Sequence, residues 1–185
     1  SMTLLAIGQL LGFQVPAYIQ TDANSAAGGA PVMTFGSNNA AGNFIVVGVL
    51  IEDTSSTVSS ITDTRSNTYQ AATTLSTYGG NRIQIWYAMN IGAGANSVTV
   101  TASTAVRTYG MIAEFSGVAT SAALDQNATG SVADNCTSGN VTTGTNGQLI
   151  IGFAVSSGSG GGASTAGSGY TRRNFYVWNE YIQIE

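Results

Sequence analysis

The stretch that decides the fold is Phe44-Ile-Val-Val-Gly-Val-Leu-Ile51, an unbroken apolar run rich in β-branched side chains. A run of this length and composition is typical of a central β-strand that is covered on both faces. Residues 149–155 (LIIGFAV) form a second run of the same kind. The sequence therefore predicts two buried central strands. Neither run approaches the roughly 20 apolar residues of a membrane-spanning helix.

Alternating side chains predict further strands on both sides of these two runs. Residues 83–89 (IQIWYAM) and 97–101 (SVTVT) have a period of two. Other strands are expected at 17–22, 31–35, 58–62, 68–72, 107–116, 139–143, 168–173 and 175–184. Turn-forming residues at 63–67, 79–81, 92–96, 146–147 and 157–162 separate them. The pattern predicts an all-β, two-sheet sandwich, jelly-roll or immunoglobulin-like, without substantial helix.

The composition of the 185 residues excludes several classes of protein. Only 8% of the residues are charged, and the chain has five arginines, no lysine and no histidine. Without histidine there is no Ser-His-Asp triad and no imidazole metal site. A net charge of −4 argues against a nucleic-acid surface. The single Cys136 cannot form an internal disulfide.

Several segments resemble a recurrent Gly/Ser/Thr-rich β-sandwich domain of secreted bacterial surface proteins and phage structural proteins. They are AGNFIVVGVLIED, SSITDTRSNTYQ, IQIWYAMNI, MIAEFSGV, GQLIIGFAV and GSGYTRRN, and the similarity runs from about Ala17 onward. The resemblance implies a non-enzymatic module in an extracellular, cell-surface or virion-surface setting. It concerns structural motifs, so it bears on the fold more than on activity.

The apolar N-terminal arm, residues 1–15, is predicted to be distinct from the sandwich domain, residues 16–185. The resemblance implies a closing apolar strand after the position of Ile184, and the arm is similar in character to that strand and to a fimbrial-type donor strand. Three alternatives follow: the arm closes its own sandwich, closes a neighbour's, or forms a short helix. As a strand, it is expected to turn its bulkier set inward, namely Leu5, Ile7 and Leu11.

Aromatic residues near the C-terminus are the best candidates for a binding site. Sugars stack on exposed rings while flanking polar groups bind their hydroxyls. The same residue types are enriched at subunit interfaces. The predicted sugar site or subunit interface consists of Trp86, Arg172, Tyr176, Trp178, Asn179 and Tyr181.

No catalytic residue, metal ligand or cofactor is predicted. The closest candidate enzyme is a glycoside hydrolase that uses two carboxylates, Glu114 and Glu180. Ca²⁺ is the one metal that suits the available oxygen ligands. Its candidate ligands are Asp125, Asn127 and Asp134, or Asp63 with Asn67, and the last two are more simply explained as turn residues.

The leading functional hypothesis is a non-catalytic structural or adhesion module, completed by strand addition between subunits. Its partners are then neighbouring subunits or further copies of the chain. The alternative is a carbohydrate-binding module of a secreted protein, with glycans as partners. Neither nucleic acid nor a transmembrane segment is expected.

Overall fold

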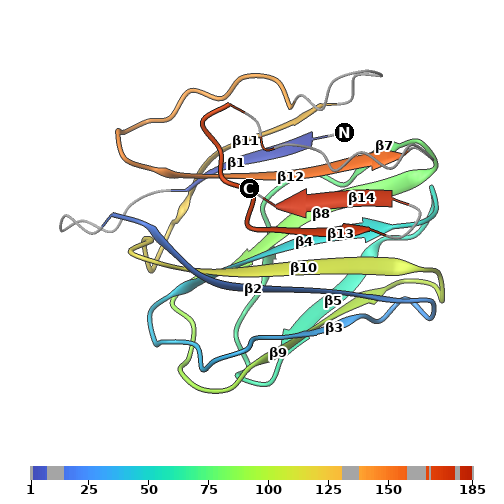
Figure 1. The fold of residues 1–185 in the computed structure, drawn as a ribbon, viewed down its shortest axis with the longest axis horizontal. Coiled ribbons are helices and arrows are strands. Elements are labelled where there is room, and N and C mark those ends of the chain that lie inside the picture. The colour runs from blue at the N-terminus through green and yellow to red at the C-terminus, as the bar shows by residue number, and fades with distance from the viewer. Residues whose placement is uncertain are drawn as a thin grey trace.

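The computed structural model describes residues 2–7, 15–130, 138–157, 166, 168–177 and 180–184 (Figure 1). This part of the chain contains no helix, and all of its paired strands are antiparallel. The strands are β1 (Met2–Ile7), β2 (Ala17–Ala26), β3 (Val32–Thr34), β4 (Phe44–Ile51), β5 (Val58–Asp63), β6 (Gln70–Ala71), β7 (Ser76–Tyr78), β8 (Asn81–Ala88), β9 (Ser97–Ala102), β10 (Thr108–Ser116), β11 (Leu124–Gly130), β12 (Leu149–Ser157), β13 (Asn174–Val177) and β14 (Glu180–Ile184).

Two large sheets form the sandwich. One has the order β11-β1-β12-β14-β13, and the other has the order β2-β10-β4-β8-β6, with β7 also paired to β8. A small sheet, β3-β9-β5, lies on the opposite side of the six-stranded sheet (Figure 1). The predicted all-β, two-sheet sandwich is confirmed, and the small third sheet is an addition that the sequence did not indicate.

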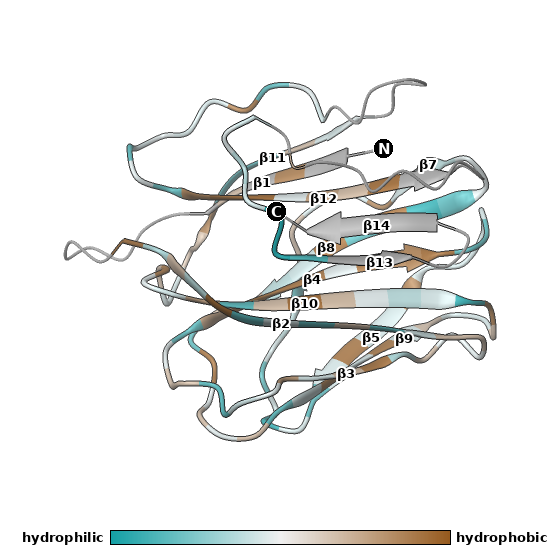
Figure 2. Cartoon of the chain, in the orientation of Figure 1, coloured by the Kyte–Doolittle hydropathy of each residue, from teal (hydrophilic) through white to brown (hydrophobic). Residues whose placement is uncertain are grey.

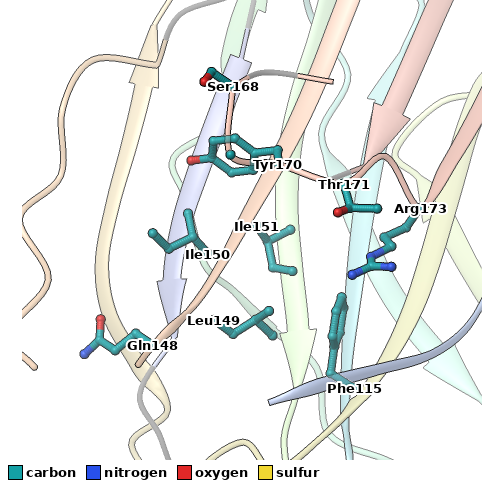
Figure 3. Close-up of a pocket in the computed structure, with 10 residues that line it drawn as sticks. Phe115, Gln148, Leu149, Ile150, Ile151, Ser168, Tyr170, Thr171 and Arg173 are labelled. Atoms are coloured by element: carbon teal, nitrogen blue, oxygen red, sulfur yellow. The ribbon is translucent and has the colours of Figure 1, made fainter. Parts of the chain in front are cut away.

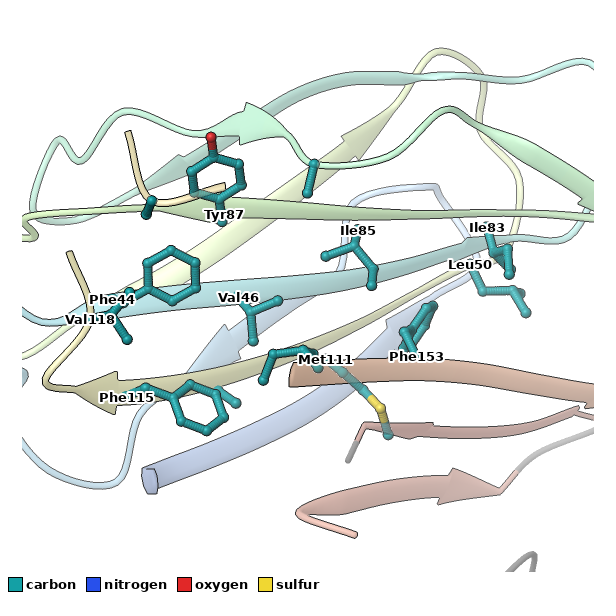
Figure 4. Close-up of a cluster of buried hydrophobic side chains, with 14 of the residues drawn as sticks. Phe44, Val46, Leu50, Ile83, Ile85, Tyr87, Met111, Phe115, Val118 and Phe153 are labelled. Carbon is teal, nitrogen blue, oxygen red and sulfur yellow. The ribbon is translucent and has the colours of Figure 1, made fainter. Parts of the chain in front are cut away.

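The six-stranded sheet is covered on both faces, as the apolar run of β4 predicted. All eight residues of β4 are buried. Phe44, Val46 and Leu50 pack in a first core against the five-stranded sheet (Figure 4), whereas Ile45 and Val47 pack in a second core against the small sheet. Figure 2 accordingly shows strongly hydrophobic residues on β5 and β9 and hydrophilic residues along β2.

A glycine brings the two large sheets close together. Gly48 of β4 faces Phe153 of β12, and a Cβ atom at Gly48 would lie 2.4 Å from the phenylalanine ring. Phe153 is fully buried in the first core, where Figure 4 shows it beside Met111 and Leu50. The missing side chain therefore provides the space in which the ring packs.

The N-terminal arm enters its own sandwich as β1. This strand lies between β11 and β12, so residues 2–7 pair as a strand with their own chain, whereas residues 8–14 of the arm lie outside the described part. Leu4 and Ala6 are buried, although they belong to the set that was not expected inside. The register places Leu4 opposite Gly152 and Ala6 opposite Ile150.

The prediction for the other set stays a prediction. Leu5 and Ile7 lie on β1, but their side chains, like the whole of Leu11, fall outside the described part of the structure. Among the described residues, no helix is long and apolar enough to cross a membrane.

Candidate functional site

The described residues of the five-stranded sheet leave a gap between β12 and residues 168–173. β14 ends at Ile184, which pairs with Phe153 on one side and Asn174 on the other. β12 continues to Leu149, past the tip of β14 (Figure 1). The chain that leads into β13 also continues past this tip.

A pocket of about 450 Å³ occupies this gap, and we call it the slot. One side of the slot is β12, which contributes Leu149 and Ile151, and the other side is formed by residues 168–173, including Tyr170 and Arg173 (Figure 3). Phe115, at the end of β10, closes one end. The volume falls in the range of about 300–1,000 Å³ that is usual for binding sites.

The floor of the slot is apolar because it belongs to the first core. Phe115 and Ile151 are almost fully buried members of that core, and Leu149 packs against it. Ile150, on the opposite face of β12, is one of few large apolar side chains that are exposed in the described structure. An apolar segment that entered the slot would therefore extend the core.

The backbone of β12 is open along the slot. Residues 149–154 pair with β1 on one edge. On the other edge, β14 pairs only with residues 153–157, so no described strand lies beside residues 149–152. An open edge of this kind presents N–H and C=O groups that pair readily with another strand.

Two polar side chains line the slot beside its apolar floor. The Arg173 guanidinium lies over the Tyr18 ring, with Cζ 4.6 Å from the ring centroid, and the side chain is exposed. Gln148 donates from Nε2 to Thr145 Oγ1 (3.2 Å), while its Oε1 is buried without a hydrogen-bond partner in the structure as described. The slot thus offers a cation and an acceptor beside an apolar floor.

The structure does not bring the predicted binding residues together at the slot. Trp86, on β8, is partly buried against the second core, and its Nε1 donates to Gln84 Oε1 (2.9 Å), so its part in sugar binding stays a prediction. Arg172 precedes Arg173 but does not line the slot.

The other predicted residues remain untested. Tyr176 lies on β13 and Tyr181 on β14, and the orientation of their side chains is outside the described structure. Trp178 and Asn179 lie between these strands, outside the described residues. Sequence reasoning missed Arg173, although it lies in the aromatic stretch that was singled out.

Glu114 of β10 is fully buried under amide groups and is not open to a substrate. Its Oε2 accepts from Gln20 Nε2 (2.6 Å) and Asn39 Nδ2 (2.7 Å), and its Oε1 accepts from Asn43 Nδ2 (2.7 Å) and the Ala40 N–H (3.1 Å). These four donors use the carboxylate to tie the segment before β4 to the sheet. The carboxylate pair considered for a glycoside hydrolase therefore lacks an accessible Glu114.

Asp63 forms a second, more exposed carboxylate cluster at the end of β5. It accepts from the backbone N–H groups of Arg65 (3.0 Å) and Asn67 (2.9 Å), and from the side chains of Asn67 (2.7 Å), Tyr69 (2.8 Å) and Asn96 (3.0 Å). Burial alone would raise the pKa of Asp63, but these hydrogen bonds outweigh burial and lower the pKa below its ordinary value. Burial, followed by the charge of Asp63, raises the pKa of Tyr69.

The calcium candidates do not gather into a site in the part of the chain that is described. The Asp63 oxygens are taken up by N–H and O–H donors, as expected for a turn residue. Asp125 accepts from the Gly144 N–H (2.7 Å), and Asp134 lies outside the described residues. No group of three or more acidic, cysteine or histidine side chains is placed to hold a metal ion among the residues described.

Comparison with known proteins adds no relative from which a function could be carried over. No family model matches the chain, and neither a curated protein nor a solved structure is significantly similar to it.

Proposed function

We propose that this chain is a non-catalytic structural or adhesion module of an extracellular or virion-surface assembly, and that an extended strand from a neighbouring subunit enters the slot. The observation that supports the proposal is the pocket of about 450 Å³ along residues 149–152 of β12, an edge beside which no described strand lies. A strand in this position would pair with residues 149–152 and lie on the apolar floor of the slot.

Two physical effects favour a strand as the occupant. The open edge of residues 149–152 would gain main-chain hydrogen bonds, which is how added strands bind to sheet edges. Alternate side chains of the strand would at the same time cover Phe115 and Ile151, extending the first core. Four residues of an extended strand span about 13 Å, so a short segment is sufficient.

The N-terminal arm was expected to be the donated or closing strand, and its position changes the form of the proposal. Because β1 already pairs with β11 and β12 of its own chain, the acceptor proposed here is the slot on the opposite edge of β12.

A carbohydrate-binding module is the second candidate function. It is favoured by the presence of an aromatic ring and two polar side chains, Tyr170, Gln148 and Arg173, around one pocket of about 450 Å³. A sugar would stack on the ring and bind the polar groups, but it would leave the edge of β12 unpaired.

A titration followed by NMR tests the proposal. The probe is an acetylated and amidated hexapeptide of alternating threonine and valine with one glutamate, added to the ¹⁵N-labelled chain. We expect shifts and slowed hydrogen exchange at the amides of residues 149–152. Thr171→Trp places a large ring at the wall of the slot and should abolish binding, whereas Thr77→Trp, on an exposed position of β7, should not.

Two results would overturn the proposal. One is that no peptide shifts the amides of residues 149–152 at millimolar concentration. The other is that the Thr171→Trp variant binds the peptide as well as the parent does. If neutral or acidic oligosaccharides shift these amides and the peptide does not, the carbohydrate-binding function replaces strand addition.

A further inference from the structure

We infer that the fold directs a spontaneous covalent modification to Asn146 and Gly147, in which a carboxylate replaces the asparagine amide. The two residues form a turn just before β12, and both are exposed. The reacting groups belong to neighbouring residues of the chain, so the reaction uses water and hydroxide alone. This inference goes beyond the proposed function and does not depend on it.

The reaction is an attack of the main chain on a side chain. Hydroxide removes the proton of the Gly147 N–H, and the nitrogen forms a bond to Asn146 Cγ. The bond between Cγ and Nδ2 breaks, and Nδ2 takes up a proton and leaves as ammonia. Water then opens the five-membered succinimide ring at one of its two carbonyl carbons. Opening at Cγ gives aspartate, whereas opening at the main-chain carbon gives isoaspartate, in which the chain continues through the former side chain.

Gly147 suits this attack because it has no side chain to crowd its nitrogen. Its φ of 77° lies in the left-handed region that glycine adopts readily and other residues rarely do. No described residue accepts a hydrogen bond from the Gly147 N–H. The attacking nitrogen is therefore not held by a partner in the part of the chain that the structure describes.

The chain is anchored on both sides of the turn. The Gly144 N–H donates to Asp125 Oδ2 (2.7 Å), which ties the segment to β11. Gln148 Nε2 donates to Thr145 Oγ1 (3.2 Å), and β12 begins at Leu149. The two reacting residues lie between these anchors and outside the strands. The main-chain rotation that brings the nitrogen onto Cγ thus breaks no strand pairing, so its cost in free energy is small.

Two other asparagines precede a small residue, and the structure protects both. Of the fourteen asparagines, only three are followed by glycine or serine. Asn24, before Ser25, lies on β2, where its backbone pairs with β10 and its Nδ2 donates to the Val32 carbonyl oxygen (2.8 Å). Asn96, before Ser97, is buried. The turn alone combines a small following residue with exposure and a backbone outside the strands.

The product changes the surface of the module in two ways. It adds one negative charge to a chain whose formal net charge is −4. Isoaspartate also lengthens the main chain by one methylene, three residues before β12 begins at Leu149. The change is not reversed by water, so the modified fraction increases with the time that the folded chain has spent in solution.

The test incubates the folded chain in mildly alkaline buffer and follows its intact mass, while circular dichroism checks that it stays folded. We expect a gain in mass equal to the exchange of NH₂ for OH, located by digestion in the peptide that contains Asn146. An isoaspartyl methyltransferase with labelled S-adenosylmethionine should label the same peptide. Asn146→Gln should lose the gain, because the attack would then have to close a six-membered ring.

Ser25→Gly is the matched control, because it gives Asn24 a glycine neighbour within β2. The dipeptide is then the same at both places, and only the surrounding structure differs. Asn24 should stay unmodified in the folded variant, whereas in urea it should react about as fast as Asn146.

Two results would overturn the inference. One is that Asn146 stays unmodified in the folded chain over a period in which the chain unfolded in urea is converted. The other is that Asn24 of the folded Ser25→Gly variant reacts as fast as Asn146, which would show that the dipeptide and not the fold selects the site. Either result would leave strand addition at the slot untouched.

Discussion

Glu114 and Asp63 are both carboxylates surrounded by amide donors, yet they hold the molecule together over different ranges. Glu114 is fully buried, and all four of its donors lie 71 to 94 residues away in the chain. Asp63 is half-buried, and it accepts from two backbone N–H groups of its own turn. The same chemistry therefore ties the segment before β4 to the six-stranded sheet at one site and shapes a local turn at the other. Burial should decide what each carboxylate contributes to stability.

The largest expected effect follows from Glu114→Ala. The substitution removes the acceptor of four N–H donors in a buried site, and each donor left unsatisfied costs about 1–3 kcal/mol. We expect the free energy of unfolding to fall by about 3–5 kcal/mol, since water can enter and satisfy some of the donors. Urea unfolding followed by tryptophan fluorescence measures the change.

Glu114→Gln is the matched control, because it keeps the volume but replaces one acceptor oxygen with an N–H₂ donor. The decrease in the free energy of unfolding should be more than half of the decrease expected for the alanine variant. A glutamine variant as stable as the parent would mean that packing, and not the acceptor, accounts for the role of Glu114.

A smaller loss is expected for Asp63→Ala. Its donors are partly open to water, so the solvent replaces most of the lost hydrogen bonds, and the free energy of unfolding should fall by about 1–2 kcal/mol. Denaturant unfolding of the Asp63→Ala and Glu114→Ala variants under the same conditions shows which of them loses more free energy of unfolding. If Asp63→Ala is the more damaging of the two, the comparison based on burial is reversed.

Acid should reduce the stability that the hydrogen bonds of Asp63 provide, because the pKa of Asp63 is lower in the folded state than in the unfolded state. The folded-state pKa of Asp63 lies below its unfolded value, so its contribution is complete above the unfolded pKa and disappears as the pH falls through the folded one. The stability difference between the parent and Asp63→Asn should therefore be largest near neutral pH and shrink between about pH 5 and about pH 2. Urea midpoints across this range test it, and a constant difference would contradict the pKa direction.

The smallest effect is expected for Tyr69→Phe, which removes one hydrogen bond and keeps the ring. The loss should be about 0.5–1.5 kcal/mol at neutral pH. Since the Tyr69 hydroxyl helps to lower the pKa of Asp63, the variant should also move the acid transition toward higher pH. A loss that exceeds that of Asp63→Ala would show that the tyrosine has a role beyond this hydrogen bond.

The core of the fold could be predicted from the sequence, because buried strands appear there as unbroken or alternating runs of apolar residues. The runs at Phe44–Ile51 and 149–155 became the central β4 and β12, and the alternation of residues 97–101 became β9. Trp86 shows the limit of this reasoning. Period two predicts which residues share a face of a strand, but not that a third sheet covers the outer face of β8.

The slot could not be predicted for a related reason. It depends on the register in which Ile184 pairs with Phe153 and Asn174, and no pattern in the sequence reports the register between distant strands. Arg173 and Gln148 become neighbours of one pocket only once that register is set. The four donors of Glu114 likewise come together through long-range contacts, which spacing along the chain does not reveal.

The place of β1 between β11 and β12 sets an order of events during synthesis. Every strand of the six-stranded sheet and of the small sheet lies between residues 17 and 116, so both have all of their strands before β11 is made. β1 is made before all of these strands, but its partners are the segments around Ala128 and Gly152. β1 therefore remains unpaired until more than a hundred further residues have followed. The five-stranded sheet pairs β1 with strands made much later, and we expect pulse-labelled hydrogen exchange to show this sheet closing last.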